Sequence, residues 1–287
     1  MEKRKKLRAA LEGTGICIAP GAHDIWSAKL IEKAGFPAVY MTGYGVSASL
    51  LGLPDIGLIS AEEMTSVARN MASAIDIPLI ADADTGFGSV LNAVRVAGAY
   101  EAAGVAAIQI EDQVFPKRCG HMEGKELIPS EEMVAKIKAI VKCRKDPDFL
   151  IIARTDARAV VGFEEAIKRA QLYKEAGADV IFLEAPTSRE EMKQAVAEVD
   201  APMLANMVNN GKTPFLRFEE LQDFGFKLVI YPVVTLYTAT KACMDNLALL
   251  KQGATDEIQD KMVDFPTFNE LIGLEEIRDF EKTIGLE

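Results

Sequence analysis

A loop-like stretch at residues 113–129 brings several reactive side-chain types close together. It reads Q-V-F-P-K-R-C-G-H-M-E-G-K-E-L-I-P, and its reactive members are Cys119, His121, Lys117, Arg118 and Lys125. Cations next to a thiol lower its pKa and favour the thiolate, so Cys119 is the cysteine best placed for chemistry. Long ordered loops are often active-site lids, and a charged surface loop is the alternative interpretation.

Two strand-like runs before this loop end in carboxylates. The first ends A-D-A-D-T-G-F-G at residues 81–88, where strand alternation predicts that Asp82 and Asp84 face the same side. The second ends Q-I-E-D, where Glu111 is the candidate. Three acids at one site repel each other unless a cation holds them, and oxygen ligands suit Mg²⁺ or Mn²⁺. The alternative for an isolated D-x-D pair is a solvated turn.

Eight short apolar runs alternate with segments of helical periodicity, and this repeat predicts the fold. The runs lie at residues 16–19, 38–42, 79–83, 106–111, 150–154, 180–184, 203–206 and 228–232. Continuous apolar strands alternating with helices specify a parallel sheet covered by helices, and eight repeats predict closure into a (β/α)8 TIM-type barrel. An open doubly wound sheet is the alternative, but no G-x-G-x-x-G fingerprint follows a strand.

The barrel is expected to occupy residues 1–253, and a helical extension residues 254–287. The extension carries Phe265, Phe268 and Phe280, which need an apolar surface to bury them. Packing on the barrel or on a neighbouring subunit would supply that surface, so the sequence favours an oligomer.

Composition limits the partners. The chain has 287 residues, and Asp plus Glu exceed Lys plus Arg by 43 to 32, for a net charge of −11. This balance argues against nucleic acid and anionic membranes as partners, although local cations can still bind a small anion. No apolar run follows the basic start or reaches the length of a membrane span. The scattered cysteines predict reduced thiols and a cytoplasmic location, and only two histidines argue against zinc.

Polar residues also follow the other predicted strands. The ends read Y-M-T-G-Y-G at residues 40–45, A-R-T-D-A-R at 153–158, L-E-A-P at 183–186 and A-N-M-V-N-N-G at 205–211. Functional groups of a barrel gather at the carboxyl ends of its strands. Arg154 could pair there with one carboxylate, and the backbone at residues 42–44 could donate to another. The implied ligand is a small oxyacid.

The motifs D-A-D-T-G-F-G, I-E-D-Q-V-F-P-K-R-C-G-H with a following G-K, and A-R-T-D-A together resemble the isocitrate lyase and phosphoenolpyruvate mutase superfamily. The K-R-C-G-H signature is similar to that of its lyase branch. The resemblance extends to the Y-P-V-V-T-L-Y segment and the helical tail. It implies a barrel whose eighth helix is exchanged between neighbours, in a homotetramer built as a dimer of dimers, with Mg²⁺ held by Asp82, Asp84 and Glu111.

The resemblance also implies a reaction and its residues. A 2-hydroxy di- or tricarboxylate would be cleaved by a retro-aldol step into an α-keto acid and a second carboxylic acid. Cys119 would be the general acid, with charge from Lys117 and Arg118, and His121 would make a hydrogen bond or a structural contact in the loop. The other implied contacts are Tyr40, Thr42, Gly43 and Tyr44 at the keto-acid carboxylate, Asp55 as an active-site acid, Arg154 and Glu184 at the reacting oxygens, Asn206 near the second carboxylate, and Gly120 and Pro232 at the substrate. The hydroxyl proton could pass to Asp55, Tyr44, Glu184 or a metal-bound water.

Three departures from relatives bear on the substrate. Met122–Gly124 and Tyr237 stand where methylisocitrate lyases carry cations, which disfavours a third carboxylate and favours an alkylmalate, as in the 2,3-dimethylmalate lyases. Pro232 replaces the serine expected of oxaloacetate hydrolases. The alternatives are a 2-methylisocitrate lyase, a carboxyphosphonoenolpyruvate phosphonomutase-type enzyme, and a non-catalytic binding barrel.

Overall fold

The computed structural model describes residues 2–120 and 122–286. The chain divides into two compact units, residues 1–236 and 237–287. The predicted domain boundary at residue 253 stays a prediction. None of the helices in the described ranges is long and apolar enough to cross a membrane.

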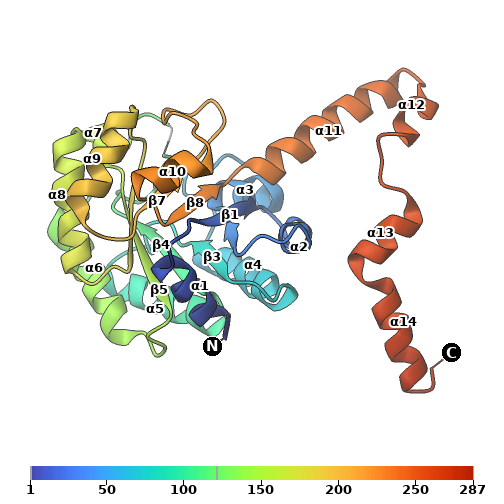
Figure 1. The fold of residues 1–287 in the computed structure, drawn as a ribbon, viewed down its shortest axis with the longest axis horizontal. Coiled ribbons are helices and arrows are strands. Elements are labelled where there is room, and N and C mark those ends of the chain that lie inside the picture. Colours follow the sequence, from blue (N-terminus) through green and yellow to red (C-terminus); the bar gives the residue numbers. More distant parts are fainter. Residues whose placement is uncertain (1, 121, 287) are drawn as a thin grey trace. The chain divides into compact units, whose positions relative to one another are not determined.

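Parallel strands form the centre of the first unit (Figure 1). They are β1 (Cys17–Ala22), β2 (Val39–Met41), β3 (Leu79–Asp82), β4 (Ala107–Glu111), β5 (Leu150–Thr155), β6 (Val180–Leu183), β7 (Leu204–Asn206) and β8 (Leu228–Tyr231). The sheet order is β6-β5-β4-β3-β2-β1-β8-β7, and a parallel bridge between Ile181 and Met203 links its two outer strands. The predicted (β/α)8 barrel is therefore confirmed.

Helices surround the strands of this unit in Figure 1. They are α1 (Glu2–Glu12), α2 (Ile25–Lys33), α3 (Gly43–Val46), the π-helical turn η1 (Ser47–Leu51), α4 (Ala61–Ala74), α5 (Val90–Ala102), α6 (Ser130–Cys143), α7 (Ala157–Val160), α8 (Phe163–Glu175), α9 (Arg189–Val199) and α10 (Phe218–Phe224). Their apolar faces and the outer faces of the strands form one large buried cluster.

A second buried cluster fills the barrel itself. Leu7 and Leu11 of α1 pack with strand residues such as Tyr40, Ile80 and Ile152. Because α1 closes the interior in this way, the functional side chains are left to the other rim, where the strands end.

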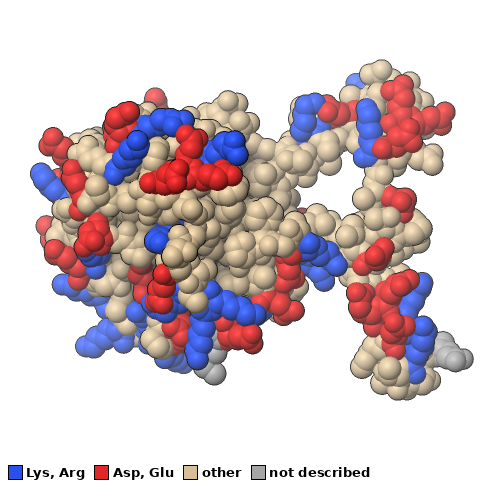
Figure 2. Space-filling view, viewed as in Figure 1, with Lys and Arg blue, Asp and Glu red and all other residues tan. Residues whose placement is uncertain are grey.

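The second unit contains most of α11 (Val234–Lys251), with α12 (Thr255–Gln259), α13 (Phe265–Ile272) and α14 (Leu274–Thr283). Ile258 is buried, whereas Phe265 and Phe280 are 79% and 62% exposed. On the face of the first unit shown in Figure 2, acidic and basic side chains are interspersed.

Candidate active site

The carboxyl ends of the strands bring the predicted residues to one rim. Asp82 ends β3, Glu111 ends β4 and Asn206 ends β7, while Arg154 lies one residue before the end of β5. Glu184 follows β6 directly. The register pairs Glu111 with Arg154, which fixes these two side chains next to each other. Sequence segments far apart in the chain therefore meet at this rim, as the barrel predicts.

One side of the rim is rich in buried acids. The Nζ atom of Lys117 lies 2.6 Å from Asp55 Oδ1 and 2.9 Å from Asp84 Oδ1. All three side chains are buried. We call Asp55, Asp82, Asp84, Glu111 and Lys117 the acidic half of the rim.

A turn, not strand alternation, places the second aspartate of the D-x-D pair. β3 ends at Asp82, and Asp84 adopts a φ of +46°, a left-handed conformation that aspartate tolerates better than most residues. Asp82 accepts hydrogen bonds from the backbone N–H of Asp84 at 3.1 Å and of Gly43 at 3.3 Å. A Cβ on Gly43 would lie 2.6 Å from Asp82 Oδ2, so only glycine allows this approach.

Burial raises the pKa values of three acids in this half, Asp82, Asp84 and Glu111. It raises the pKa of Asp84 to about 7, and it holds the pKa of Glu111 well above its usual range. Burial also raises the pKa of Asp82, although Lys117 opposes that effect. Each carboxylate would gain from a further cation.

The donor set fits a hard divalent cation that keeps some of its water. Asp84 Oδ2 and Glu111 Oε1 are buried without a hydrogen-bond partner among the described residues. Within residues 2–120 and 122–286, no three His, Cys, Asp or Glu side chains are close enough to hold a metal ion directly. Mg²⁺ commonly binds through one or two carboxylates and several waters, which agrees with both observations.

The other side of the rim balances its own charges. Arg154 donates from Nε and Nη2 to the two carboxylate oxygens of Asp156, at 2.9 and 3.0 Å. Its guanidinium also lies 3.4 Å from Glu111 and 3.4 Å from Glu184. The Nζ atom of Lys125 is 2.8 Å from Asp156 Oδ1. We call Lys125, Arg154, Asp156 and Glu184 the balanced half of the rim.

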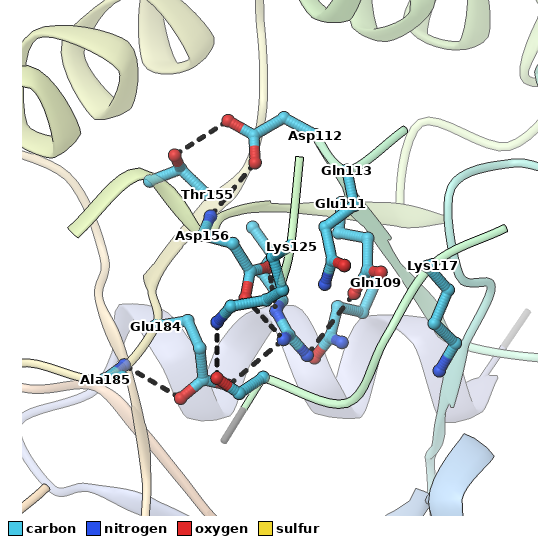
Figure 3. Close-up of polar contacts among 12 residues, drawn as sticks. Gln109, Glu111, Asp112, Gln113, Lys117, Lys125, Thr155, Asp156, Glu184 and Ala185 are labelled. Atoms are coloured by element: carbon cyan, nitrogen blue, oxygen red, sulfur yellow. Dashed lines mark hydrogen bonds and ion pairs between the residues drawn. The ribbon is translucent and has the colours of Figure 1, made fainter. Parts of the chain in front are cut away.

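Figure 3 shows Lys125, Asp156 and Glu184 grouped on one side of the view and Lys117 on the other, with Glu111 and Gln109 between them. Although burial acts in the opposite direction, Arg154 and Lys125 hold the pKa of Asp156 at about 2. Asp156 is therefore charged at any working pH.

Contacts within the protein hold the predicted lid, residues 113–129, at Gln113 and at Gly120. Gln113 receives a hydrogen bond from the Arg118 N–H and donates to the Arg118 carbonyl, both at 2.9 Å. A Cβ on Gly120 would lie 2.8 Å from Glu184 Oε2, so the backbone there packs directly on the rim. Cys119 is half-buried and Arg118 is exposed. His121 lies outside the described residues.

Several predicted substrate contacts already have partners within the protein. The Tyr40 hydroxyl donates to Gln109 Oε1 at 3.1 Å inside the barrel. The Thr42 hydroxyl caps α3 by accepting from the Gly45 N–H at 3.3 Å. Asn206 donates to Glu184 Oε2 at 3.2 Å. Pro232 is buried after β8, and Tyr44 is half-buried.

The sequence did not single out Asp156 or Asp112, and it gave Lys125 no partner. Asp112 accepts from Thr155 Oγ1 and the Tyr173 hydroxyl, both at 2.7 Å. It also accepts from the Asp156 N–H at 3.0 Å. The one available signal was that each aspartate lies within two residues of a predicted site residue.

Comparison with known proteins gives a consistent picture. The family profile described as Phosphoenolpyruvate phosphomutase matches residues 7–250. The chain is 51% identical to 2,3-dimethylmalate lyase from Eubacterium barkeri, over 98% of both chains. It is 46% identical to 2-methylisocitrate lyase from Aeropyrum pernix, over 96% of this chain and 88% of that protein.

Solved structures share the architecture. Oxaloacetate acetylhydrolase in complex with the inhibitor 3,3-difluorooxalacetate superposes with a TM-score of 0.94 at 35% identity, covering 99% of this chain and 98% of that one. Phosphonopyruvate hydrolase in complex with oxalate and Mg²⁺ superposes with a TM-score of 0.89 at 35% identity, covering 98% and 99%.

Proposed function

Because the chain belongs to the phosphoenolpyruvate phosphomutase family, within the phosphoenolpyruvate mutase and isocitrate lyase superfamily, we propose that it is a Mg²⁺- or Mn²⁺-dependent carbon–carbon lyase acting on an alkylmalate. The substrate would be a 2-hydroxy dicarboxylate of the 2,3-dimethylmalate type. Its products would be an α-keto acid such as pyruvate and a second carboxylic acid.

The seating of the lid carries this proposal. Lys117, two residues before Cys119, contacts Asp55 and Asp84 in the acidic half, and Gly120, directly after Cys119, packs against Glu184 in the balanced half. These contacts on either side of Cys119 support its placement at the rim between the two halves. A thiol there can deliver a proton to a substrate bound at the strand ends.

The reaction balances with the residues at the rim. A base takes the proton of the C2 hydroxyl, and Asp55, Tyr44 and Glu184 are the candidates. The C2–C3 bond then breaks, the oxygen on C2 becomes the keto oxygen, and the electron pair remains on the fragment that contains C3. Cys119 protonates C3 before the fragments recombine, while the seated lid excludes water that would compete as an acid.

Asp82, Asp84 and Glu111 would hold the cation, partly through water, and when bound it would polarise the hydroxyl and keto oxygens. Arg154 lies between Glu111 and Glu184, where it can orient a substrate oxygen. Asn206 would lie near the second carboxylate. Met122 and Tyr237 offer no cation to a third carboxylate, so a dicarboxylate is favoured over 2-methylisocitrate.

A substrate panel tests the proposal. The protein is incubated with Mg²⁺ and 2-alkylmalates, 2,3-dimethylmalate, 2-methylisocitrate or oxaloacetate. The keto acid formed from each hydroxy acid is measured, and the oxalate released from oxaloacetate. We expect keto acid from an alkylmalate, and no keto acid from any hydroxy acid would refute the lyase. Turnover of 2-methylisocitrate alone would favour the second candidate, which the 46% identity supports. Hydrolysis of oxaloacetate alone would show that the interpretation of Pro232 is wrong.

A cysteine variant tests the general acid. We expect Cys119→Ser to lower kcat by about 10²- to 10⁴-fold, the range of general acid–base catalysis, while Mg²⁺ binding is kept. Cys143→Ser is the matched control, because that thiol is exposed and lies on α6. Full activity of Cys119→Ser would exclude Cys119 as the proton donor.

We also propose a homotetramer in the cytoplasm. The second unit exposes large apolar side chains, including Phe265, Phe280 and Leu247 at 79%, 62% and 63%. Such a surface favours burial against another copy, by the exchange of the eighth helix that the resemblance implies. Light scattering of the purified protein should give four times the mass of one chain. The scattered cysteines, which form no close pair in the sequence, support the cytoplasmic location.

A further inference from the structure

The lid contains a second buried cation besides Lys117. The side chain of Lys125 is 2% exposed, and its ammonium contacts two oxygens on different segments. One is the carbonyl oxygen of Gly120, which accepts a hydrogen bond, and the other is Asp156 Oδ1 at 2.8 Å. Lys125 therefore connects the peptide that follows Cys119 to the barrel rim.

The barrel end of this connection is rigid. Asp156 is completely buried and receives two hydrogen bonds from Arg154. Its backbone N–H donates to Asp112, which also accepts from Tyr173 and Arg169 of α8. An anchor held by this many bonds fixes the ammonium to the strand ends.

At the lid end of the connection, the position of Gly120 affects the position of the Cys119 thiol. Gly120 packs against Glu184 so closely that a Cβ would lie 2.8 Å from Glu184 Oε2. A shift of the Gly120 carbonyl would also move Cys119, which precedes it in the chain. Proton transfer requires the donor within hydrogen-bond distance of the reacting atom, so a small displacement of the thiol would slow it.

We propose that Lys125 is a positioning residue, which latches the Cys119–Gly120 peptide to Asp156 and so aims the Cys119 thiol at the substrate. An ammonium is suited to this task because a hydrogen bond from a charged donor is stronger than one from a neutral donor. Burying that charge is tolerable only because Asp156 compensates it. The catalytic meaning of the latch rests on the proposed function, whereas the closure of the lid does not.

The first experiment measures lid closure without any substrate. In a Cys143→Ser, Cys243→Ser background, the rate of Cys119 alkylation by iodoacetamide at pH 8 is followed by peptide mass mapping. We expect Lys125→Met to raise this rate about tenfold, because a charge-assisted hydrogen bond is lost. Lys125→Arg, which can reach both oxygens, should restore most of the protection. Lys138→Met, an exposed lysine on α6, should leave the rate unchanged.

The second experiment separates positioning from binding. With an alkylmalate that the wild type turns over, Lys125→Met should lower kcat about 100-fold, the expected cost of a misplaced catalytic group, and change KM less than threefold. Lys125→Arg should recover at least a tenth of kcat. A merely structural lysine would lower kcat only in proportion to the loss of folded protein, measured by thermal unfolding, so kcat per folded enzyme would stay at the wild-type value.

The two experiments distinguish failure of the latch from failure of the proposed lyase activity. Wild-type alkylation and kcat in a folded Lys125→Met variant would overturn the latch. A wild type without lyase activity would refute the proposed function, yet the alkylation rates would still decide the latch. If Lys125→Met does not fold, Lys125→Gln replaces it, because an amide cannot neutralise Asp156, and the same rise in alkylation is expected.

Discussion

The two halves of the rim differ in how their buried charges are compensated. The acidic half sets four carboxylates against one ammonium, in Asp55, Asp82, Asp84, Glu111 and Lys117. The balanced half sets two carboxylates against two cations, in Asp156, Glu184, Arg154 and Lys125. Both halves lie at the ends of neighbouring strands, so the fold alone does not explain the difference.

The difference assigns a separate task to each half. Buried carboxylates that outnumber the cations beside them are costly, and the raised pKa values of Asp84 and Glu111 express that cost. A divalent cation would remove it, which suits the acidic half to ligand binding. In the balanced half, Arg154 and Lys125 compensate the buried acids within the protein, and Lys125 and Gly120 of the 113–129 loop contact this half.

The largest expected effect comes from breaking the balanced half. We expect Asp156→Asn to lower the free energy of unfolding by about 3–5 kcal/mol at pH 7, because Arg154 and Lys125 remain buried without their partner. The pKa of Asp156 is about 2 in the folded protein, below its unfolded value. Its contribution to stability is therefore complete above about pH 4 and is lost as the pH falls towards 2. Urea unfolding at several pH values measures this profile.

An exposed ion pair provides the matched control. Asp200 pairs with Lys174 at 2.9 Å, but its side chain is 91% exposed. Asp200→Asn should leave the urea midpoint unchanged, since asparagine also tolerates the left-handed backbone there. Equal losses from Asp156→Asn and Asp200→Asn would show that burial of the pair does not matter.

In the acidic half, we expect removal of a carboxylate to increase the free energy of unfolding, by less than the loss of Asp156 decreases it. Burial raises the pKa of Asp84 to about 7, above its unfolded value. The metal-free protein therefore loses stability as the pH rises from about 4 to 7, because the folded state must release a proton it retains more strongly. We expect Asp84→Asn to raise the free energy of unfolding in EDTA by about 2 kcal/mol at pH 8, with little gain at pH 4.

Mg²⁺ should reverse the order of stability of the wild type and the Asp84→Asn variant. Excess Mg²⁺ should stabilise the wild type against urea, since it binds only the folded state, and should stabilise Asp84→Asn much less. The variant that is more stable in EDTA would then be the less stable one with Mg²⁺. A variant that is less stable than the wild type in EDTA at pH 8 would contradict the description of the acidic half as undercompensated.

The sequence predicted the barrel because its information is local and repeated. Each of the eight apolar runs overlaps a strand, and helices lie between the strands as the alternating pattern predicted. The helical extension expected at residues 254–287 contains three helices, Thr255–Gln259, Phe265–Ile272 and Leu274–Thr283. The short helices α3 and α7 were not predicted, because four residues are too few to show a period.

Site residues could be predicted from the sequence only where the barrel fold brings the ends of different strands together. Strand ends meet at one rim, so Asp82, Glu111 and Arg154 could be grouped from the sequence. The partners of Lys125 could not, because a flexible four-carbon side chain on a loop has no period that indicates its direction. Asp84 reaches the rim through a φ of +46°, which alternation does not describe.

The smallest expected effect comes from adding an acid to the balanced half. Asn206 donates from Nδ2 to Glu184 Oε2 at 3.2 Å. Asn206→Asp removes this donor and gives the balanced half a third carboxylate, next to Glu184, so that its acids outnumber its cations, as they do in the acidic half. We expect a loss of about 1 kcal/mol in the free energy of unfolding at pH 8, close to the net value of one hydrogen bond.

The pH dependence decides whether this loss is due to charge. At pH 4 one of the two carboxyls can hold a proton and donate to the other, so most of the loss should disappear. Asn210→Asp is the matched control, because Asn210 is exposed and aspartate accepts its φ of +56°. It should show no difference between pH 4 and pH 8. An equal loss for Asn206→Asp at both pH values would mean that shape, and not charge, governs the balanced half, and that the contrast between the two halves does not extend to Glu184.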